Sequence, residues 1–87
     1  MTMIVWAPKS LLGTHYHGNE ECFFQAIHPG LVQTINMDKE NHITKFVKST
    51  EYTLINDMIG SHSMANSSSR LTNTSYHIYI RHDYYDN

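Results

Sequence analysis

The residue types that bind transition-metal ions are concentrated in one short segment, His15-Tyr16-His17-Gly18-Asn19-Glu20-Glu21. Residues two apart on a β-strand point to the same side, so a strand through His15 and His17 presents both imidazoles to one point. Gly18-Asn19 is typical of a turn. A strand that starts at Glu20 or Glu21 and runs back beside the first would bring a carboxylate to the imidazoles, and the strand register favours Glu21. Two imidazoles and one carboxylate suit Fe, Mn, Co, Ni, Cu or Zn, with positions left for water or substrate.

This segment resembles the first motif of the cupin superfamily, G-x5-H-x-H-x(3,4)-E-x6-G. His15, His17 and Glu21 stand at the spacing of the family's metal ligands. The two glycine positions that frame the motif are occupied by Lys9 and His28. The ligand positions therefore match the family pattern, and the turns that the glycines would shape are expected to differ.

Residues 56–66 are similar to the family's second motif, P-x-G-x2-H-x3-N, through His62 and Asn66. Gly60 stands one residue after the glycine position of that motif. The resemblance covers most of the chain, from about Pro8 to Arg81. It implies a small jelly-roll β-barrel that holds one divalent transition-metal ion (Fe, Mn, Ni, Cu, Co or Zn) through His15, His17, Glu21 and His62.

The pattern of apolar residues and turn formers predicts an all-β chain independently of that resemblance. Short β-branched or aromatic stretches predict strands over residues 3–7, 10–17, 21–28, 31–37, 43–48, 52–55 and 75–81. Turns or loops are expected at residues 18–19, 29–30, 38–41, 57–61 and 65–73. No segment predicts a helix, a repeat or a linker. We therefore expect one domain over residues 1–87, a sandwich or barrel of short antiparallel strands, with the first motif at about 9–28 and the second at about 57–66.

The segment Glu21–His28 is apolar on both sides of the expected strand. Glu21, Phe23 and Gln25 share one side, and Cys22 and Phe24 share the other. Both sides should be covered, and in so short a chain a second subunit could cover one of them, so a homodimer is expected. Gln25 falls on the side expected to carry the ligands, where it could contact substrate or only a backbone group.

Other chemistry-bearing residues carry weaker expectations. Asn66 is interpreted as a turn former, Cys22 as a buried thiol, and Phe23 and Phe24 as core residues. Tyr79 and Gln25 are candidates for a catalytic role. The remaining histidines fall in no motif and are interpreted as surface or packing residues: His28, His42, His77 and His82.

Composition excludes several classes of protein. The chain of 87 residues has a formal net charge of -2 and no basic tract, which argues against a nucleic-acid partner. No apolar run approaches the roughly 20 residues of a membrane-spanning helix. The single cysteine cannot form an internal disulfide, which agrees with a reducing, cytoplasmic location.

The resemblance to cupins implies three possible functions. The first is an oxidoreductase, most simply a dioxygenase acting on a small organic molecule. The second is a non-redox isomerase or lyase, which would need a titratable group beside the metal, with Glu20, His77 and Tyr79 as the available candidates. The third is a module that binds a small molecule or a metal without turnover. The ligand set does not distinguish them, and family frequency places the oxidoreductase first.

Overall fold

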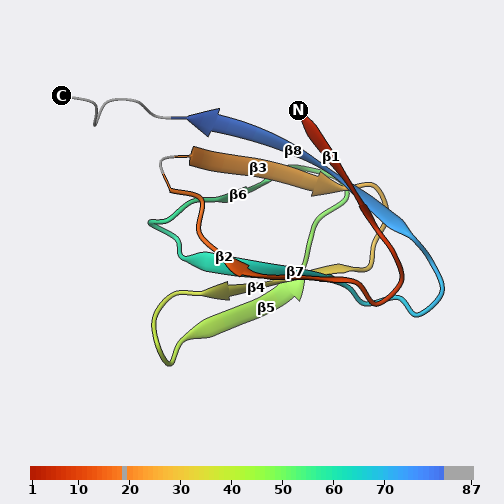
Figure 1. Cartoon of the computed structure of the whole chain (residues 1–87), viewed down its shortest axis with the longest axis horizontal. Coiled ribbons are helices and arrows are strands. Elements are labelled where there is room, and N and C mark those ends of the chain that lie inside the picture. The colour runs from red at the N-terminus through yellow and green to blue at the C-terminus, as the bar shows by residue number, and fades with distance from the viewer. Residues whose placement is uncertain (19, 82–87) are drawn as a thin grey trace.

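Eight short strands form two four-stranded antiparallel sheets in the computed structural model, which describes residues 1–18 and 20–81 (Figure 1). The first sheet contains, in spatial order, β1 (Thr2–Trp6), β8 (Asn73–Arg81), β3 (Glu20–Ala26) and β6 (Thr53–Ile55). The second contains β2 (Leu11–His15), β7 (Ser61–Asn66), β4 (Leu31–Asn36) and β5 (His42–Phe46). The all-β prediction is confirmed. Within the described ranges no helix reaches the length and apolarity that a membrane crossing requires.

The strand pairs are nested in the sequence. β1 pairs with β8, β2 with β7, β3 with β6, and β4 with β5, all antiparallel. Two further pairs, β3 with β8 and β4 with β7, join these into the two sheets. The chain passes from one sheet to the other at every connection except the one between β4 and β5. Consecutive strands therefore face each other across the interior.

The predicted hairpin at Gly18-Asn19, in which β2 would pair with β3, does not form. The chain does turn there, because Gly18 has a φ of 61° and the N–H of Glu20 donates to the carbonyl of His17 at 3.1 Å. However, β2 pairs with β7, and β3 pairs with β6 and β8 in the opposite sheet. Turn-forming residues show where a chain reverses, but not which sheet the next strand joins. Asn19 itself lies outside the described residues.

Strand β7 was not predicted from the sequence. Residues 57–61 were expected to form a loop and 65–73 a turn, but β7 occupies Ser61–Asn66 and pairs on both sides, with β2 and β4. Its sequence, S-H-S-M-A-N, is too polar to suggest a central strand. Its inward side chains are nevertheless fully enclosed, because His62, Met64 and Asn66 are each at most 2% exposed.

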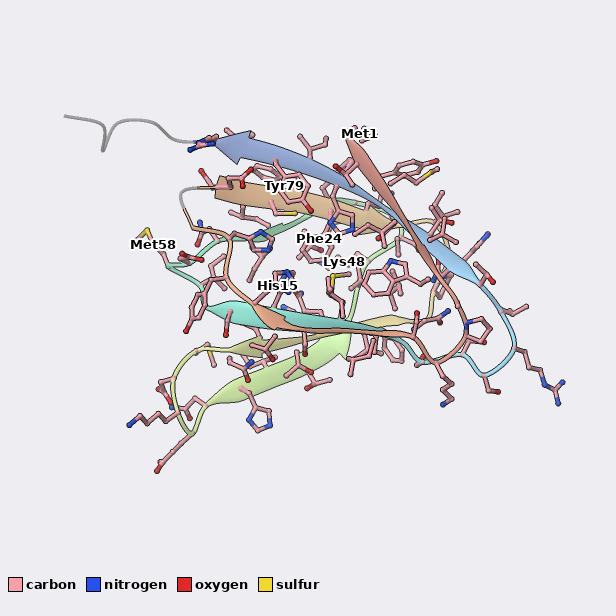
Figure 2. All side chains as sticks on the ribbon, viewed as in Figure 1. Met1, His15, Phe24, Lys48, Met58 and Tyr79 are labelled. Atoms are coloured by element: carbon pink, nitrogen blue, oxygen red, sulfur yellow. The ribbon has the colours of Figure 1, made fainter. Side chains whose placement is uncertain are left out.

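The space between the sheets is only partly apolar. Trp6, Phe24, Leu31, Ile55 and Met64 form much of the hydrophobic core. Several polar side chains are buried beside them: Gln33, Ser61, His62, Asn66, Asn73, Ser75 and His77. Figure 2 shows Phe24 and His15 between the two sheets. A buried polar group requires a hydrogen-bond partner or a ligand, so these residues direct attention to a site inside the sandwich.

Candidate metal centre

Three histidines meet between the sheets. His15, His17 and His62 each offer one ring nitrogen, and these nitrogens all lie within 4.8 Å of one another. The Nε2 atom of His62 is 2.9 Å from that of His17 and 3.0 Å from that of His15. Three imidazoles that converge through the same ring atom can hold one metal ion. The structure therefore brings together three of the four ligands that the sequence predicted.

An irregularity in β2 aligns His15 with His62. Leu12 is opposite Met64, and three residues later His15 is opposite His62, only two residues back along β7. β2 thus carries one extra residue between these pairs, which is a β-bulge. Without it, Thr14 would lie opposite His62 and His15 would point outward. The bulge is the feature that turns the imidazole of His15 into the site.

His17 lies beyond the end of β2 and is held by a different contact. Its backbone N–H donates to Oδ1 of Asp57 at 2.8 Å. Asp57 belongs to the connection between β6 and β7, which leads directly into His62. The two sequence segments that resemble the cupin motifs are therefore joined by this hydrogen bond at the same end of the sandwich, on the left in Figure 1.

Gly60 fixes the approach of the chain to His62. Its φ is 144°, a conformation that residues with a Cβ rarely adopt. A Cβ at Gly60 would also overlap the backbone carbonyl of Asn36 on β4. Gly60 therefore lets β7 start against β4, with His62 two residues later on the inward side.

The hydrogen bonds of His15 and His62 determine which ring nitrogens are free. Nδ1 of His15 lies 2.8 Å from the carbonyl of Gly13, which can only accept, so this nitrogen carries a hydrogen. Nδ1 of His62 lies 2.9 Å from Oε1 of Gln33, which also accepts. In the neutral rings both Nε2 atoms then carry lone pairs, and these face each other over 3.0 Å. Such an arrangement is repulsive unless a cation, or an N–H of His17, whose Nε2 lies 2.9 Å from that of His62, compensates the lone pairs.

The spacing of the nitrogens also fits a metal ion. With metal–nitrogen bonds of about 2.1 Å, adjacent corners of an octahedron are about 3.0 Å apart and corners of a tetrahedron about 3.4 Å. The observed separations of 2.9 and 3.0 Å match the octahedral edge. The two separations that involve His62 therefore agree with a metal that has further coordination positions.

The surroundings favour neutral imidazoles, the form that binds metals. Burial, followed by the nearby His15, His17 and His77, lowers the pKa of His62 to about 3. The pKa of His17 is lowered chiefly by burial and then by His15, against the opposite effect of the carboxylates of Asp57 and Glu20. Protons therefore compete weakly for these ligands near neutral pH.

The structure does not bring Glu21 to the three histidines. On β3 the buried side chains are Cys22, Phe24 and Ala26, while Glu21 alternates with Phe23 on the other, partly exposed side. The register argument that placed Glu21 beside the imidazoles assumed a hairpin between β2 and β3, which does not form. Glu20 shares the inward side and acts electrostatically on His17, but the ligand group includes neither carboxylate.

The two catalytic candidates have different environments. Gln25 lies on the partly exposed side of β3 and donates to the carbonyl of Ser49 at 2.7 Å, so it supports the backbone and not the site. Tyr79 on β8 lies over the site, with its ring centre 6.1 Å from that of His17. Burial, followed by the effect of Cys22, raises the pKa of Tyr79, which keeps its hydroxyl protonated at neutral pH. Tyr79 is thus a neutral hydrogen-bond donor, and its hydroxyl interacts with the thiol of Cys22.

Sequence reasoning missed one residue that supports the site. Gln33 was not singled out, although it lies between Leu31 and Ile35 on the inward side of β4 and is only 1% exposed. A polar residue on an otherwise apolar inward side was the signal that could have identified it. Gln33 accepts from His62 and so orients that ligand.

His77, expected to be a surface or packing residue, is buried behind the site. Its ring stacks between those of Phe24 and Tyr79, with centres 5.6 and 6.2 Å away. Its Nε2 lies 2.7 Å from the hydroxyl of Ser75, and its Nδ1 lies 3.6 Å from the thiol of Cys22. Burial raises the pKa of that thiol to about 11, so Cys22 is an un-ionised free cysteine. Cys22, His77 and Ser75 thus form a hydrogen-bonded group on the sheet opposite the one that carries His15 and His62.

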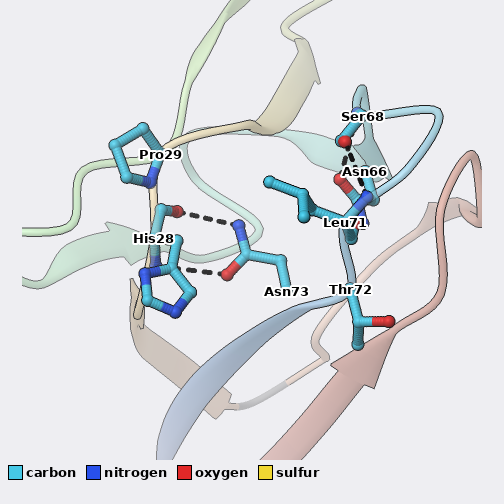
Figure 3. Close-up of a pocket in the computed structure, with 7 residues that line it drawn as sticks. All are labelled: His28, Pro29, Asn66, Ser68, Leu71, Thr72 and Asn73. Atoms are coloured by element: carbon cyan, nitrogen blue, oxygen red, sulfur yellow. Dashed lines mark hydrogen bonds between the residues drawn. The ribbon is translucent and has the colours of Figure 1, made fainter.

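A pocket of about 330 Å³ lies elsewhere, beside the connections β3–β4 and β7–β8 (Figure 3). Asn66, which lines it, is four residues from His62 along β7, or about 13 Å. The amide of Asn66 donates to carbonyls of Trp6 and Leu71, and that of Asn73 to the carbonyl of His28. The buried amides of this pocket therefore hold the surrounding chain in place, which extends the turn-forming role expected of Asn66.

Comparisons with known proteins do not assign the chain to a family. No family model matches its sequence, and no curated protein matches it. The class of the protein must therefore be inferred from the fold and from the three-histidine site.

Proposed function

We propose that this chain is a small jelly-roll protein of the cupin kind, in which His15, His17 and His62 hold one divalent transition-metal ion. We further propose that it acts on a small organic molecule as a metal-dependent oxidoreductase. The observation that carries the proposal is the pair of Nε2 lone pairs, on His15 and His62, that face each other over 3.0 Å. A metal ion between them would turn this repulsion into coordination.

The strand order supports the jelly-roll assignment. Two four-stranded sheets with the nested pairs β1–β8, β2–β7, β3–β6 and β4–β5 are the arrangement expected of eight strands in a double Greek key. Lys9 adds support, because it stands at the framing glycine position of the cupin motif and has a φ of 60°. A residue in that left-handed conformation is what a glycine position requires.

The residues around the site have distinct roles in the proposed reaction. The carbonyl of Gly13 and the amide of Gln33 orient the rings of His15 and His62. Phe24, whose ring centre is 5.8 Å from that of His62, keeps water from that side, and the hydroxyl of Tyr79 can donate a hydrogen bond to a substrate. The metal, when bound, would supply a redox centre or an electrophile.

We place redox chemistry first of the two catalytic interpretations. The nitrogen separations that match an octahedral edge are compatible with redox-active Fe, Mn, Co or Ni. A redox reaction also needs no protein base. The isomerase or lyase reading rests on Glu20, the half-buried carboxylate on the inward side of β3, which is close enough to act electrostatically on His17.

Metal uptake tests the proposal. Purified protein would be dialysed separately against Fe(II), Mn, Co, Ni, Cu and Zn and its metal content measured. We expect one ion per chain, loss of binding in His62→Ala, and unchanged binding in the control His42→Ala, whose side chain is exposed. Absence of uptake, or equal loss in both variants, would overturn the metal site.

Two further measurements separate the chemistries. The Co(II) form should show the weak d–d absorption of a six- or five-coordinate ion, and intense tetrahedral bands would contradict the geometric argument. The Fe(II) form would be supplied with a panel of small organic molecules in the presence and absence of O2. Consumption of O2 that depends on an added molecule supports the oxidoreductase, whereas anaerobic turnover that is lost in Glu20→Gln supports the isomerase or lyase.

A further inference from the structure

The outer side of the first sheet is unusually apolar. On β8 the polar residues Asn73, Ser75 and His77 are buried, so that Tyr76, Ile78 and Ile80 point outward. The neighbouring strands extend this surface. We call the set the outer apolar face and define it by seven residues: Met3, Val5, Phe23, Leu54, Tyr76, Ile78 and Ile80.

Strand register shows that this face is continuous. Met3 is opposite Tyr76 across the β1–β8 pair, and Phe23 is opposite both Ile78 on β8 and Leu54 on β6. The apolar side chains thus extend across all four strands. Val5 and Met3 are 63% and 58% exposed, so the described residues leave much of the face open to solvent.

We infer that the outer apolar face is the interface of a homodimer, in which two copies of this chain pack their first sheets face to face. This inference is independent of the metal site. The residues of the face come from the outer side of one sheet, and two sheets can pack face to face at a spacing of about 10 Å. Every copy of the chain carries the same face, so a second copy is always available as a partner.

The charge of the face argues for a second copy over other occupants. Glu21 is the one charged side chain that alternates onto this face within the described strands. A nucleic acid or an anionic membrane would require lysine or arginine there. Depletion of charge is instead typical of the buried centre of a homodimer interface.

The size of the face agrees with a modest dimer. Four strands about 4.8 Å apart, and six residue steps of about 3.4 Å from Thr74 to Ile80, give a footprint of about 400 Å². Two such footprints, with the added area of protruding side chains, reach about 1,000 Å², near the lower limit for a specific interface. An interface near this limit is typical of weak, reversible association, so we expect monomer and dimer to exchange in the micromolar range.

Sedimentation velocity of the full chain, between about 1 and 100 µM, tests the inference. We expect a concentration-dependent change from monomer to dimer. The double variant Met3→Lys, Val5→Lys should weaken dimerisation at least about tenfold, because it places like charges across the interface. The matched control is Phe46→Lys, which changes a 68% exposed side chain on the outer side of the second sheet and should leave the dimer intact.

A monomer throughout that range would overturn the inference, as would equal dissociation in Phe46→Lys. A monomeric full chain whose shortened form, ending at Arg81, dimerises would show that residues 82–87 occupy the face instead, and would also overturn it. Circular dichroism and urea unfolding would verify that each variant is folded. If the double variant is unfolded, Ile80→Lys, at a 45% exposed position, replaces it with the same expected weakening.

Discussion

His15 and His62 lie opposite each other across the β2–β7 pair because β2 carries one extra residue between Leu12 and His15. Their Nε2 atoms are 3.0 Å apart. The extra residue falls where Gly13 also provides the carbonyl that accepts from Nδ1 of His15. The bulge therefore both aims the ring and fixes its tautomer, which makes it the local feature on which the proposed metal site most depends.

Deletion of Gly13 should weaken metal binding without unfolding the protein. Removal of the extra residue makes the β2–β7 pairing regular, with Thr14 opposite Ser63 and His15 still opposite His62, but it removes the carbonyl that accepts from Nδ1 of His15. Because the tautomer of His15 is then no longer fixed, metal affinity should fall by about 10–100-fold, as measured by competition with a chromophoric chelator. The control is Gly13→Ala, since a Cβ at Gly13 meets nothing within 4 Å. Unchanged affinity in the deletion variant would mean that the carbonyl of Gly13 does not fix the tautomer of His15.

Gly60→Ala should destabilise the fold as well as the site. Alanine disfavours the φ of 144°, and its Cβ would overlap the carbonyl of Asn36. We expect a loss of roughly 2–4 kcal/mol in the free energy of unfolding, with a lower urea midpoint than that of Gly13→Ala. Metal affinity should fall too, because His62 follows two residues later. A variant as stable as the wild type would contradict the close approach of β7 to β4.

The sequence predicted the strands better than their partners. Seven of the eight strands were expected near their observed positions, because β-branched and aromatic residues mark a pleated, half-buried segment locally. The polar strand β7 was not recognised, since its burial comes from long-range pairing with β2 and β4. The pairing of β2 with β3 was also wrong, because the choice of sheet depends on contacts far apart in the chain.

The dependence on contacts far apart in the chain also explains which residues of the site were predicted and which were not. His15, His17 and His62 were identified because spacing and motif resemblance are visible in sequence. Glu21 was placed beside them through a hairpin that does not form, and β3 turns Cys22 inward instead. Gln33 was missed because its partner, His62, is 29 residues away. Ligand types were thus predictable, whereas their supporting residues depended on the fold.

Replacement of Lys9 by glycine should give a more stable protein than replacement by alanine. Its φ of 60° is unfavourable by about 1–2 kcal/mol for a residue with a Cβ. Glycine avoids this cost, but it loses more backbone entropy on folding, which offsets part of the gain. We expect Lys9→Gly to be more stable than Lys9→Ala by about 1 kcal/mol in urea unfolding. The reverse order would show that residue 9 does not adopt the left-handed conformation in solution.

Acidification should destabilise the metal-free protein partly through His77. Burial, and then the nearby His17 and His15, lower its pKa from 6.5 to about 4. Between these values the unfolded chain binds a proton that the folded chain does not, so stability falls as the pH drops through that window. The urea midpoint of His77→Gln should therefore vary less between pH 7 and pH 4 than that of the wild type. The exposed His42→Gln serves as the control, and an identical pH profile in His77→Gln would contradict the prediction.

Gln33→Leu should weaken metal binding while the three ligands remain in place. The Oε1 atom of Gln33 accepts from Nδ1 of His62 at 2.9 Å, which keeps the lone pair of Nε2 directed at the site. Without that acceptor, His62 can place its hydrogen on Nε2, and affinity should fall by about 10–100-fold. Gln25→Leu is the matched control, because Gln25 contacts only the carbonyl of Ser49 among the hydrogen bonds described for its side chain. Competition titrations with Co(II) would measure both variants. Equal affinity of Gln33→Leu and Gln25→Leu would mean that the orientation of His62 does not depend on Gln33, and that the facing lone pairs are not enforced by the fold.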